Sequence, residues 1–458
     1  MRVPWSEREW REVVVYGMGR SGLAAARLLR SRGVRVHAVD ARSEVAMGDL
    51  AGDPGIELRL GDERSLPPNV DGVVLSPGVP PTTPLVREAT ARGVPVIAEV
   101  ELAYAFLDGI VVGVTGSNGK STTATLTAAM LEAAGLPAVL CGNIGEPLAG
   151  LVEGPPGRIF VVELSSFQLE TVRRFRADAA ALLNVSPDHL DRYPDLAAYA
   201  AAKERIFERQ DESSTAVLNG DDPAVVSIGL GVERARRRWF SREHPVEDGC
   251  FVDGETVVET SPGEVPTELF AVAEMALVGS HNVENAMAAS LLALAAGGDR
   301  SSVRRAVARF DGLPHRTRRI ALRRGVAWYD DSKGTNVGAT LKSLEGFGDG
   351  SVHLVLGGLG KGQDFSALRG AVARKVKSIY LIGADAAAIE AALAGTAPLE
   401  RAETLERAVE AAAAAALPGE VVLLSPACAS FDQFTDFSHR GRRFQELVAA
   451  LDAEGRDG

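Results

Sequence analysis

The feature that most limits the possible folds is a repeated alternation of short apolar segments with amphipathic ones. Near the start of the chain it runs through residues 13–16, 21–30 and 34–39. Apolar strands that alternate with helices predict a parallel β-sheet with helices on its faces. The pattern restarts near residue 110 and again near residue 326. We therefore predict an α/β protein with three domains in a row.

The length of the chain agrees with this organisation, because 458 residues correspond to about three domains of ordinary size. We place the domains at residues 1–108, 109–312 and 313–458. The first and third are expected to be Rossmann-like, and the central one P-loop ATPase-like with a small β-rich part. That part lies between about residues 236 and 272, where Asp253-Gly254 separates two apolar runs and predicts a hairpin.

Composition and charge exclude several classes of protein. A formal net charge of −12 argues against a nucleic-acid binder, which usually has a basic face. The sequence contains neither a run of about 18 apolar residues nor the apolar core of a signal peptide. Cys141, Cys250 and Cys428 are widely separated and form no metal-binding pair or disulfide framework. We expect a cytoplasmic monomer that acts on small molecules, without nucleic-acid or membrane partners.

A glycine-rich loop between a strand and a helix carries the strongest chemical signal, in GIVVGVTGSNGKSTTATL at residues 109–126. Backbone N–H groups of such a loop surround phosphate oxygens, and the helix N-terminus adds a favourable dipole. Lys120 is expected to reach the β- and γ-phosphates, and the hydroxyl of Ser121 or Thr122 to face Mg²⁺. The strict phosphate-loop pattern needs glycine where this chain has Val114. We predict ATP binding through a variant loop.

Acidic and imidazole side chains follow two later strands and are candidate Mg²⁺ ligands. Glu163 ends an apolar strand in VVELSSFQLE, and His189 lies beyond another strand in NVSPDHLDRY. The carboxyl ends of parallel strands form the functional edge of such a sheet. Either residue alone fits a capping or surface role, but together with a phosphate loop they favour a metal site. Asp188 and Asp191 are alternative ligands.

A second glycine loop precedes the first expected helix. Gly17, Gly19 and Gly22 have the G-x-G-x-x-G spacing, and Asp40 follows 18 residues after Gly22, where a ribose-binding acid is expected. One interpretation is an NAD-dependent oxidoreductase, although it explains nothing after residue 110. The other is that the loop holds a different ligand that contains a pyrophosphate.

Further motifs are distributed over all three predicted domains. They are NIGEP, ELSSFQLE, NVSPDHLDRY, AAKERI, GSHNVENAMAA, GLPHR, DSKGTN, LGGLGKGQDF and SPACASFDQF. Together with TGSNGKST they resemble the Mur ligases, the ATP-dependent amide-forming enzymes of peptidoglycan synthesis. DSKGTN and SPACASFDQF are most similar to the members that add D-glutamate.

The resemblance implies a division of labour among the domains. The first would bind the UDP end of UDP-N-acetylmuramoyl-L-alanine, the second ATP and metal, and the third D-glutamate, with the active site where the domains meet. The substrate carboxylate would attack the γ-phosphate of ATP to give an acyl phosphate, and the D-glutamate amine would then displace phosphate.

The resemblance also assigns residues to the ATP and metal sites. Lys120, Glu163, His189 and Lys203 would be catalytic. Ser121, Glu163, His189 and a carbamylated Lys203 would hold Mg²⁺, although by spacing alone Lys203 is a solvated helix lysine. Asn282 and Asn285 would approach the adenine or the ribose. The full set for ATP is Gly116, Ser117, Asn118, Gly119, Lys120, Ser121, Thr122, Asn282, Asn285, Arg316 and Asp331.

The remaining assignments concern the two substrates to be joined. The UDP substrate would contact Gly17, Gly19, Arg20, Ser21, Gly22, Asp40, Arg42, Ser76, Pro77, Gly78, Asn143, Ser165 and Gln168. This chain has Ala41 where relatives often carry a hydroxyl residue, which weakens the expected uracil contact. D-glutamate would contact Lys333, Thr335, Lys361, Ser430 and Phe437, and lysines and hydroxyls suit a dianionic amino acid.

Other functions remain open at this stage. Within the same enzyme class the alternatives are another Mur ligase or an amide ligase like folylpolyglutamate synthase. From other classes they are the NAD-dependent oxidoreductase and a non-enzymatic module driven by ATP, for which DSKGTN and SPACAS would have no use. The dependence of phosphate release on a particular amino acid distinguishes the ligases.

Overall fold

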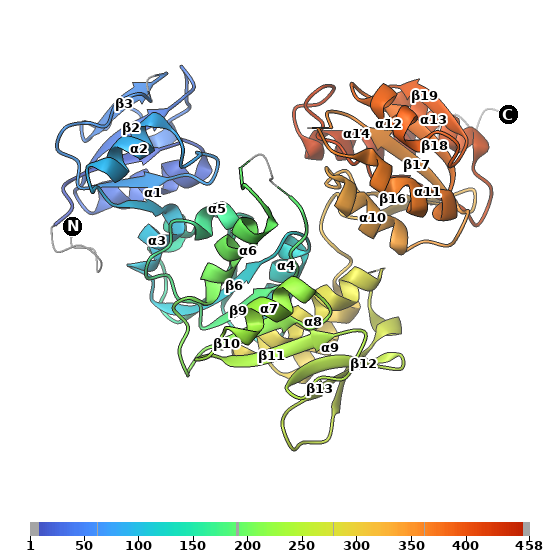
Figure 1. Ribbon diagram of the computed structural model, residues 1–458, viewed down its shortest axis with the longest axis horizontal. Helices are drawn as coiled ribbons and strands as arrows, with labels where there is room; N and C mark the ends of the chain where they lie inside the picture. The colour runs from blue at the N-terminus through green and yellow to red at the C-terminus, as the bar shows by residue number, and fades with distance from the viewer. Residues whose placement is uncertain (1–8, 62, 189–191, 278, 361, 452–458) are drawn as a thin grey trace. The chain divides into compact units, whose positions relative to one another are not determined.

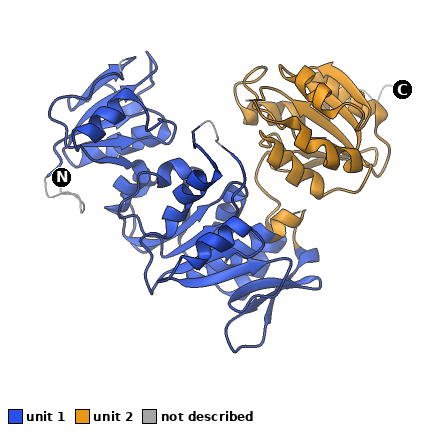
Figure 2. Cartoon of the chain, viewed as in Figure 1, with its two compact units in different colours: residues 1–274, 284–308 blue, residues 275–283, 309–458 orange. Residues whose placement is uncertain are grey.

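The computed structural model describes residues 9–61, 63–188, 192–277, 279–360 and 362–451. The chain divides into two compact units, which are residues 1–274 with 284–308 and residues 275–283 with 309–458 (Figure 2). They contain three β-sheets with helices against them (Figure 1), so the predicted α/β class is confirmed. The described residues include no helix long and apolar enough to cross a membrane.

The first sheet is a five-stranded parallel sheet in the first unit. Its order is β3 (Ile56–Leu60), β2 (Arg35–Asp40), β1 (Glu12–Tyr16), β4 (Gly72–Leu75) and β5 (Val96–Ala98). The helices are α1 (Arg20–Ser31), α2 (Pro84–Ala91) and α3 (Glu99–Tyr104), with a short 3₁₀ turn at Gly48–Leu50. The strand order reverses between β1 and β4, and ligands of such sheets bind at this switch point.

The second sheet has nine strands and carries the predicted phosphate loop. Its order is β14 (Thr267–Ala271), β13 (Thr256–Thr260), β12 (Gly249–Asp253), β11 (Arg236–Ser241), β10 (Thr215–Asn219), β9 (Ala179–Leu182), β6 (Gly109–Thr115), β8 (Arg158–Glu163) and β7 (Ala138–Gly142). The helices are α4 (Lys120–Ala133), α5 (Ser166–Leu169), α6 (Leu196–Glu204), α7 (Pro223–Leu230), α8 (Ser280–Ala295) and α9 (Arg300–Arg309), with 3₁₀ turns at Leu148–Leu151, Arg205–Phe207 and Val272–Glu274.

The β-rich part of the central region extends this sheet and does not form a separate one. β12 pairs in parallel with β11, whereas β13 and β14 are antiparallel additions. β12 and β13 form the hairpin expected at Asp253-Gly254, with Asp253 opposite Thr256 and Gly254 at φ 62°. The sequence prediction of a hairpin is confirmed.

The third sheet lies in the second unit. Its order is β15 (Arg318–Arg323), β16 (Val326–Asp330), β20 (Val421–Leu424), β17 (Val352–Gly357), β18 (Val376–Ile382) and β19 (Leu399–Glu403), and only β15 is antiparallel. The helices are α10 (Val337–Glu345), α11 (Arg369–Lys375), α12 (Ala386–Leu393), α13 (Leu405–Ala415) and α14 (Phe437–Ala450), with a 3₁₀ turn at Phe365–Leu368. The alanine-rich α13 packs Ala408 and Ala412 into the core.

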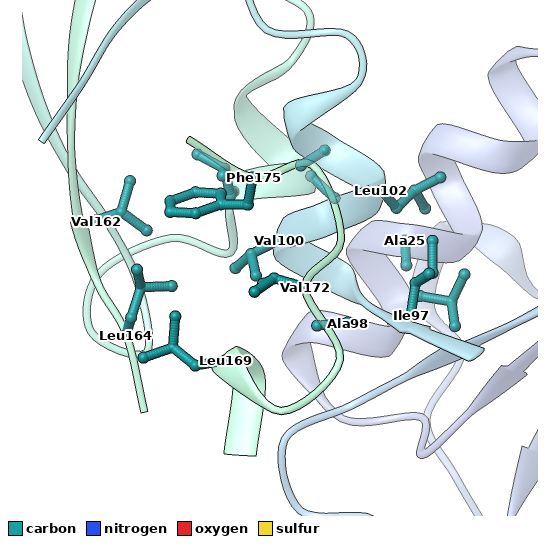
Figure 3. Close-up of a cluster of buried hydrophobic side chains, with 14 of the residues drawn as sticks. Ala25, Ile97, Ala98, Val100, Leu102, Val162, Leu164, Leu169, Val172 and Phe175 are labelled. Carbon is teal, nitrogen blue, oxygen red and sulfur yellow. The ribbon is translucent and has the colours of Figure 1, made fainter. Parts of the chain in front are cut away.

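A shared hydrophobic core joins the first two sheets within the first unit. Figure 3 shows Val100 and Leu102 of α3 between Ala25 of α1 and the side chains of Val172 and Phe175. The buried Glu101 of α3 also accepts hydrogen bonds from the backbone N–H groups of residues 173, 174 and 175, at 2.8–2.9 Å. α3 is therefore a firmly packed connection and not a loose linker.

Candidate active site

The glycine loop after β6 has the backbone shape of a phosphate-binding loop. Gly116 and Gly119 have positive φ angles of 153° and 83°, which side chains disfavour. A Cβ atom on Gly119 would also lie 2.2 Å from Asn285 Oδ1. Gly119 precedes α4, and no side chain caps the N-terminus of that helix. The uncapped end leaves an electropositive site for an anion.

Residues after β9 hold this loop in place. The backbone N–H groups of Ser117 and Asn118 donate to the backbone and side-chain oxygens of Asn184, at 2.9 and 2.8 Å. The Asn184 amide donates back to the Asn118 carbonyl at 3.1 Å, and Ser117 Oγ donates to the Ser186 carbonyl at 3.0 Å. The loop is thus preorganised by its neighbouring strand.

Two lysine ammonium groups meet at the same loop carbonyl. Lys120 Nζ donates to the carbonyls of Gly116 and Ser117 at 2.8 and 2.9 Å, and Lys203 Nζ donates to Gly116 at 2.8 Å. Lys203 is only 1% exposed and lies 4.4 Å from the centre of the Tyr199 ring. Burial, together with the charge of Lys120, holds the pKa of Lys203 well below its ordinary value. The interpretation of Lys203 as a solvated lysine is wrong.

Glu163 lies beside the loop, because β8 pairs with β6 so that Glu163 is opposite Val114. One carboxylate oxygen accepts a hydrogen bond from Asn143 Nδ2 at 2.7 Å. The other, Oε2, is buried and has no hydrogen-bond partner among the described residues. A carboxylate oriented by an amide, with one free oxygen, fits a Mg²⁺ ligand.

Other predicted metal ligands can be placed only in part. His189 and the alternative Asp191 lie outside the described residues, whereas Asp188 is described and its charge acts on Lys203. Within the part of the chain that the structure describes, no group of three or more His, Cys, Asp or Glu side chains could hold a metal. Among the described residues, Glu163 has a buried carboxylate oxygen beside the loop that fits a cation there.

The two asparagines predicted at the nucleotide fall in different units. Asn285 belongs to the first unit, is buried, and accepts a hydrogen bond from Thr123 Oγ1 of α4 at 3.3 Å. Asn282 belongs to the second unit, and its backbone N–H donates to the Gly279 carbonyl at 3.0 Å. Asn285 therefore adjoins the phosphate loop, and its contact with the adenine or the ribose stays a prediction.

The three glycines of the first loop have separate roles. Gly17 has φ 88° and donates its N–H to the Val39 carbonyl at 2.8 Å. A Cβ atom on Gly22 would lie 2.0 Å from the Gly17 carbonyl oxygen, so the fold itself requires glycine there. A Cβ atom on Gly19 would meet nothing within 4 Å. Gly19 is the N-terminal boundary of α1, which also has no side-chain cap.

Asp40 organises the loop around it. Its oxygens accept from the Met18 N–H at 2.7 Å and from Arg42 Nε and Nη2, both at 2.8 Å. The side-chain hydrogen bond from Arg42 lowers the pKa of Asp40 to about 2. Ser76 Oγ donates to the Gly17 carbonyl at 2.5 Å, which connects the loops after β1 and β4. Pro77 and Gly78 lie in the turn that follows, in which the Val79 N–H donates to the Ser76 carbonyl at 3.0 Å.

Four further residues predicted at the UDP substrate lie near α5 and α1. Ser165 and Gln168 form a capping box at the start of α5, in which each side chain accepts the backbone N–H of the other residue. The Arg20 guanidinium donates to the Gly145 carbonyl of the central region. Ser21 lies in the first turn of α1.

In the second unit, Asp331 is enclosed by donors. Ser343 Oγ and Ser425 Oγ donate to its Oδ2 at 2.6 and 2.7 Å, and the Thr317 N–H donates to its Oδ1 at 3.1 Å. Burial raises the pKa of Asp331 to about 6, although these hydrogen bonds and the nearby charge of Arg316 oppose the shift. Asp331 thus lies within the electrostatic influence of Arg316, and the contact of both residues with ATP stays a prediction.

The residues predicted to bind D-glutamate flank the carboxyl ends of β16 and β20. Lys333 Nζ lies 3.8 Å from the centre of the Phe437 ring, and Ser430 is buried in the loop after β20. The Thr335 N–H donates to the Lys333 carbonyl at 2.8 Å. Lys361 lies outside the described residues.

The sequence prediction missed Arg440 on α14. This arginine is 1% exposed and donates to Ser332 Oγ and the Ser332 carbonyl, both at 2.9 Å, and to the Cys428 carbonyl at 3.0 Å. Burial lowers its pKa to about 10. Arg440 joins the DSKGTN and SPACAS loops, and its position four residues before the core residue Phe444 is the signal that could have revealed it.

Comparison with known proteins follows the same three regions. Residues 11–98 match the N-terminal domain of MurD-like Mur ligases, residues 114–293 the Mur ligase middle domain, and residues 315–428 the Mur ligase glutamate ligase domain. A UDP-N-acetylmuramoylalanine–D-glutamate ligase from Koribacter versatilis is 45% identical over 448 residues, covering 96% of this chain and 98% of the relative. The chain belongs to the Mur ligase family.

Further relatives agree with this Mur ligase membership. A second protein of the same name, from Anaeromyxobacter dehalogenans, is 45% identical and covers 95% of this chain and 97% of its own. Among solved structures, a UDP-N-acetylmuramate–alanine ligase from Thermotoga maritima has a TM-score of 0.60 at 18% identity, covering 97% of this chain and 100% of its own. The likeness to the solved structure concerns the Mur ligase fold alone.

Proposed function

We propose that this Mur ligase joins D-glutamate to UDP-N-acetylmuramoyl-L-alanine, with conversion of ATP to ADP and phosphate, in peptidoglycan precursor synthesis. The observation that carries the proposal is 41–45% identity, over almost the whole chain, to relatives named as ligases of this kind. The phosphate loop, its two lysines and the D-glutamate motifs give that activity a chemical basis.

The first step would be attack of the substrate carboxylate on the γ-phosphate of ATP. Both reactants are anions, so the chief requirements are charge neutralisation and in-line positioning. Lys120 Nζ lies at the Gly116 carbonyl of the phosphate loop, and the uncapped N-terminus of α4 supplies backbone N–H groups. Glu163, His189 and Ser121 would hold Mg²⁺, which supplies charge neutralisation at the phosphate oxygens.

Lys203 supports the metal site if it is carbamylated. Carbamylation requires a neutral amine, and the burial that lowers the pKa of Lys203 favours that form. The resulting anion would sit at the Gly116 carbonyl, beside Lys120.

The second step would be attack of the D-glutamate amine on the acyl phosphate. Lys333, Thr335, Lys361, Ser430 and Phe437 would hold the amino acid. Its two carboxylates suit the lysines and hydroxyl groups of this set. Such an enzyme is expected to be a cytoplasmic monomer with these small molecules as partners.

Release of phosphate tests the function directly. The purified protein receives ATP, Mg²⁺ and UDP-N-acetylmuramoyl-L-alanine, and D-glutamate, L-glutamate, L-alanine or a diamino acid is added in turn. We expect phosphate release with D-glutamate only. Release with a different amino acid would identify another Mur ligase activity. Transfer of labelled oxygen from the substrate carboxylate to phosphate tests the acyl phosphate.

A further inference from the structure

A small cavity lies between the loop after β4 and the helix α5, both in the first unit. Ser76, Pro77 and Val79 form one side, and Phe167, Gln168 and Arg192 are on the other. Its free volume is about 10 Å³, which is close to the space that one water-sized group occupies. The cavity can therefore receive a single oxygen-sized group.

Two of the residues that line this cavity each have a buried donor atom without an acceptor among the described residues. Gln168 Nε2 and Arg192 Nε are both buried from solvent, and neither has a partner among the residues that the structure describes. Gln168 as a whole is 2% exposed. Buried donors are nearly always paired, because an unpaired one loses its hydration without compensation. Two such donors at one cavity indicate a missing acceptor.

The side-chain oxygen of Gln168 and one terminal nitrogen of Arg192 are already engaged. Gln168 Oε1 accepts hydrogen bonds from the backbone N–H and the hydroxyl of Ser165, both at 2.9 Å. These bonds fix the orientation of the amide, so that Nε2 is the atom left to donate to a ligand. The Arg192 guanidinium lies 3.8 Å from the centre of the Phe167 ring, and its Nη2 donates to Glu170 Oε2 at 2.7 Å. Both donors are thus held in place before any ligand arrives.

The cavity adjoins the switch point of the first sheet, where a ligand is expected to bind. Ser76 lines the cavity and also donates to the carbonyl of Gly17 in the first glycine loop. These two loops follow β4 and β1, between which the strand order reverses, and pyrophosphate groups bind at such a switch point. An oxygen in the cavity would therefore lie beside a bound diphosphate.

We propose that Arg192 Nε and Gln168 Nε2 bind one diphosphate oxygen of UDP-N-acetylmuramoyl-L-alanine. The cationic guanidinium favours a negatively charged acceptor over a neutral carbonyl. Glu170 acts through Arg192 as a positioning residue. This proposal rests on the proposed function for the identity of the substrate, and it adds Arg192 and Glu170 to the residues that recognise it.

The first test is the kinetics of Arg192→Met with each substrate varied in turn. We expect the KM for UDP-N-acetylmuramoyl-L-alanine to rise by about 10- to 100-fold, because a charge-assisted contact is lost. The KM values for ATP and D-glutamate and the value of kcat are expected to stay close to those of the wild type. Arg192→Lys should rescue little, since an ammonium cannot stack, pair with Glu170 and donate into the cavity together.

Arg32→Met is the matched control. Arg32 also lies over a phenylalanine ring, at 5.3 Å from the centre of Phe106, and pairs with Glu153 at 2.5 Å. It does not line the cavity. Its loss should leave all three KM values unchanged, and thermal melting of both variants checks that they are folded.

Glu170→Gln separates positioning from direct contact. Alone it should raise the KM for the UDP substrate by a smaller factor than Arg192→Met. In the Arg192→Met background it should add nothing further, because its effect passes through the guanidinium. Additive effects would contradict the positioning role.

Calorimetric binding of UDP and of the full substrate identifies the acceptor without turnover. An equal loss of affinity for UDP and for the full substrate in Arg192→Met supports a diphosphate oxygen as the acceptor. Weakening of the full substrate alone would place the acceptor in the muramoyl arm and overturn the assignment, as would unchanged binding of both. A wild-type protein without D-glutamate-dependent phosphate release would refute the proposed function, while the UDP measurement would still decide the role of Arg192.

Discussion

The molecule contains two glycine loops of similar construction and different surroundings. Each follows a parallel strand, each has a glycine just before its helix, and neither helix N-terminus has a side-chain cap. Around the loop at Gly17 lie the Asp40 carboxylate, which is paired with Arg42, and the hydroxyl of Ser76. The loop at Gly116 has two lysine ammonium groups, and Glu163 with an unpartnered oxygen lies beside it.

The surroundings of the two loops distinguish a site that only binds a phosphate from a site that also transfers one. Backbone N–H groups and a helix dipole suffice to bind a pyrophosphate, and both loops offer them. Phosphoryl transfer also requires positive charge at the γ-phosphate and ligands for a metal. Among the described residues, the loop at Gly116 has two lysine ammonium groups and a carboxylate oxygen without a partner, whereas the carboxylate at Gly17 is paired with Arg42. The glycine spacing at Gly17 therefore predicts a ligand group and not a reaction.

Replacing Lys120 is the strongest way to test this comparison. We expect Lys120→Met to lower kcat by about 10³-fold or more, because its ammonium neutralises charge that develops in the transition state. UDP binding at the other loop should be unchanged. Phosphate-release kinetics and UDP calorimetry measure the two effects.

Lys342→Met is a suitable control, since Lys342 is an exposed lysine paired with Glu345 on α10. It should retain full activity. Near-normal turnover by Lys120→Met would contradict the assignment of the reacting loop.

Glu163→Gln tests the carboxylate beside the loop at Gly116, one oxygen of which has no hydrogen-bond partner among the described residues. We expect the Mg²⁺ concentration for half-maximal activity to rise by about 10- to 100-fold, because the amide that replaces the free oxygen carries no charge. A magnesium titration of phosphate release measures this, with the exposed Glu132→Gln of α4 as the charge-matched control. An unchanged magnesium requirement would exclude Glu163 as a ligand.

Two glycine replacements at the first loop distinguish folding from binding. Gly22→Ala forces a methyl group to 2.0 Å from the Gly17 carbonyl, so we expect a loss of about 1–3 kcal/mol in the free energy of unfolding. Gly19→Ala meets open space and should cost less than about 1 kcal/mol. Its methyl group would instead occupy the space of a phosphate, and UDP affinity should fall by about tenfold.

Thermal melting and UDP calorimetry on both variants complete this test. A Gly19→Ala protein with normal UDP affinity would show that the ligand does not approach the backbone there.

The sequence predicts the fold best where strands are buried on both faces. β1, β6 and β17 consist mostly of buried apolar residues, which is the pattern of a central parallel strand. The edge strands β3 and β19 were not predicted, because Glu57 and Arg59 in β3 and Glu400 and Arg401 in β19 interrupt the apolar pattern. An edge strand has an exposed face, so its sequence is close to that of a loop.

The site was predictable from local motifs but not from long-range pairing. The loop at Gly116 and the strand that ends at Glu163 are each visible in a few consecutive residues. The burial of Lys203 depends on the contact of α6 with a loop 87 positions earlier in the chain, which periodicity does not encode. The same holds for Arg440, whose partner Ser332 lies 108 positions away.

The smallest expected effect concerns the ion pair beside the first loop. Arg42 lowers the pKa of Asp40 from 3.8 to about 2, so the native state binds fewer protons than the unfolded state between these values. The stabilisation is present above pH 3.8 and is lost as the pH falls through 2. Arg42→Met should therefore lower the melting temperature of the ligand-free protein at pH 7 by about 2 °C or less, because Arg42 is largely exposed. The difference from the wild type should narrow below about pH 4, and a difference that is independent of pH would mean that Arg42 acts through packing and not through Asp40.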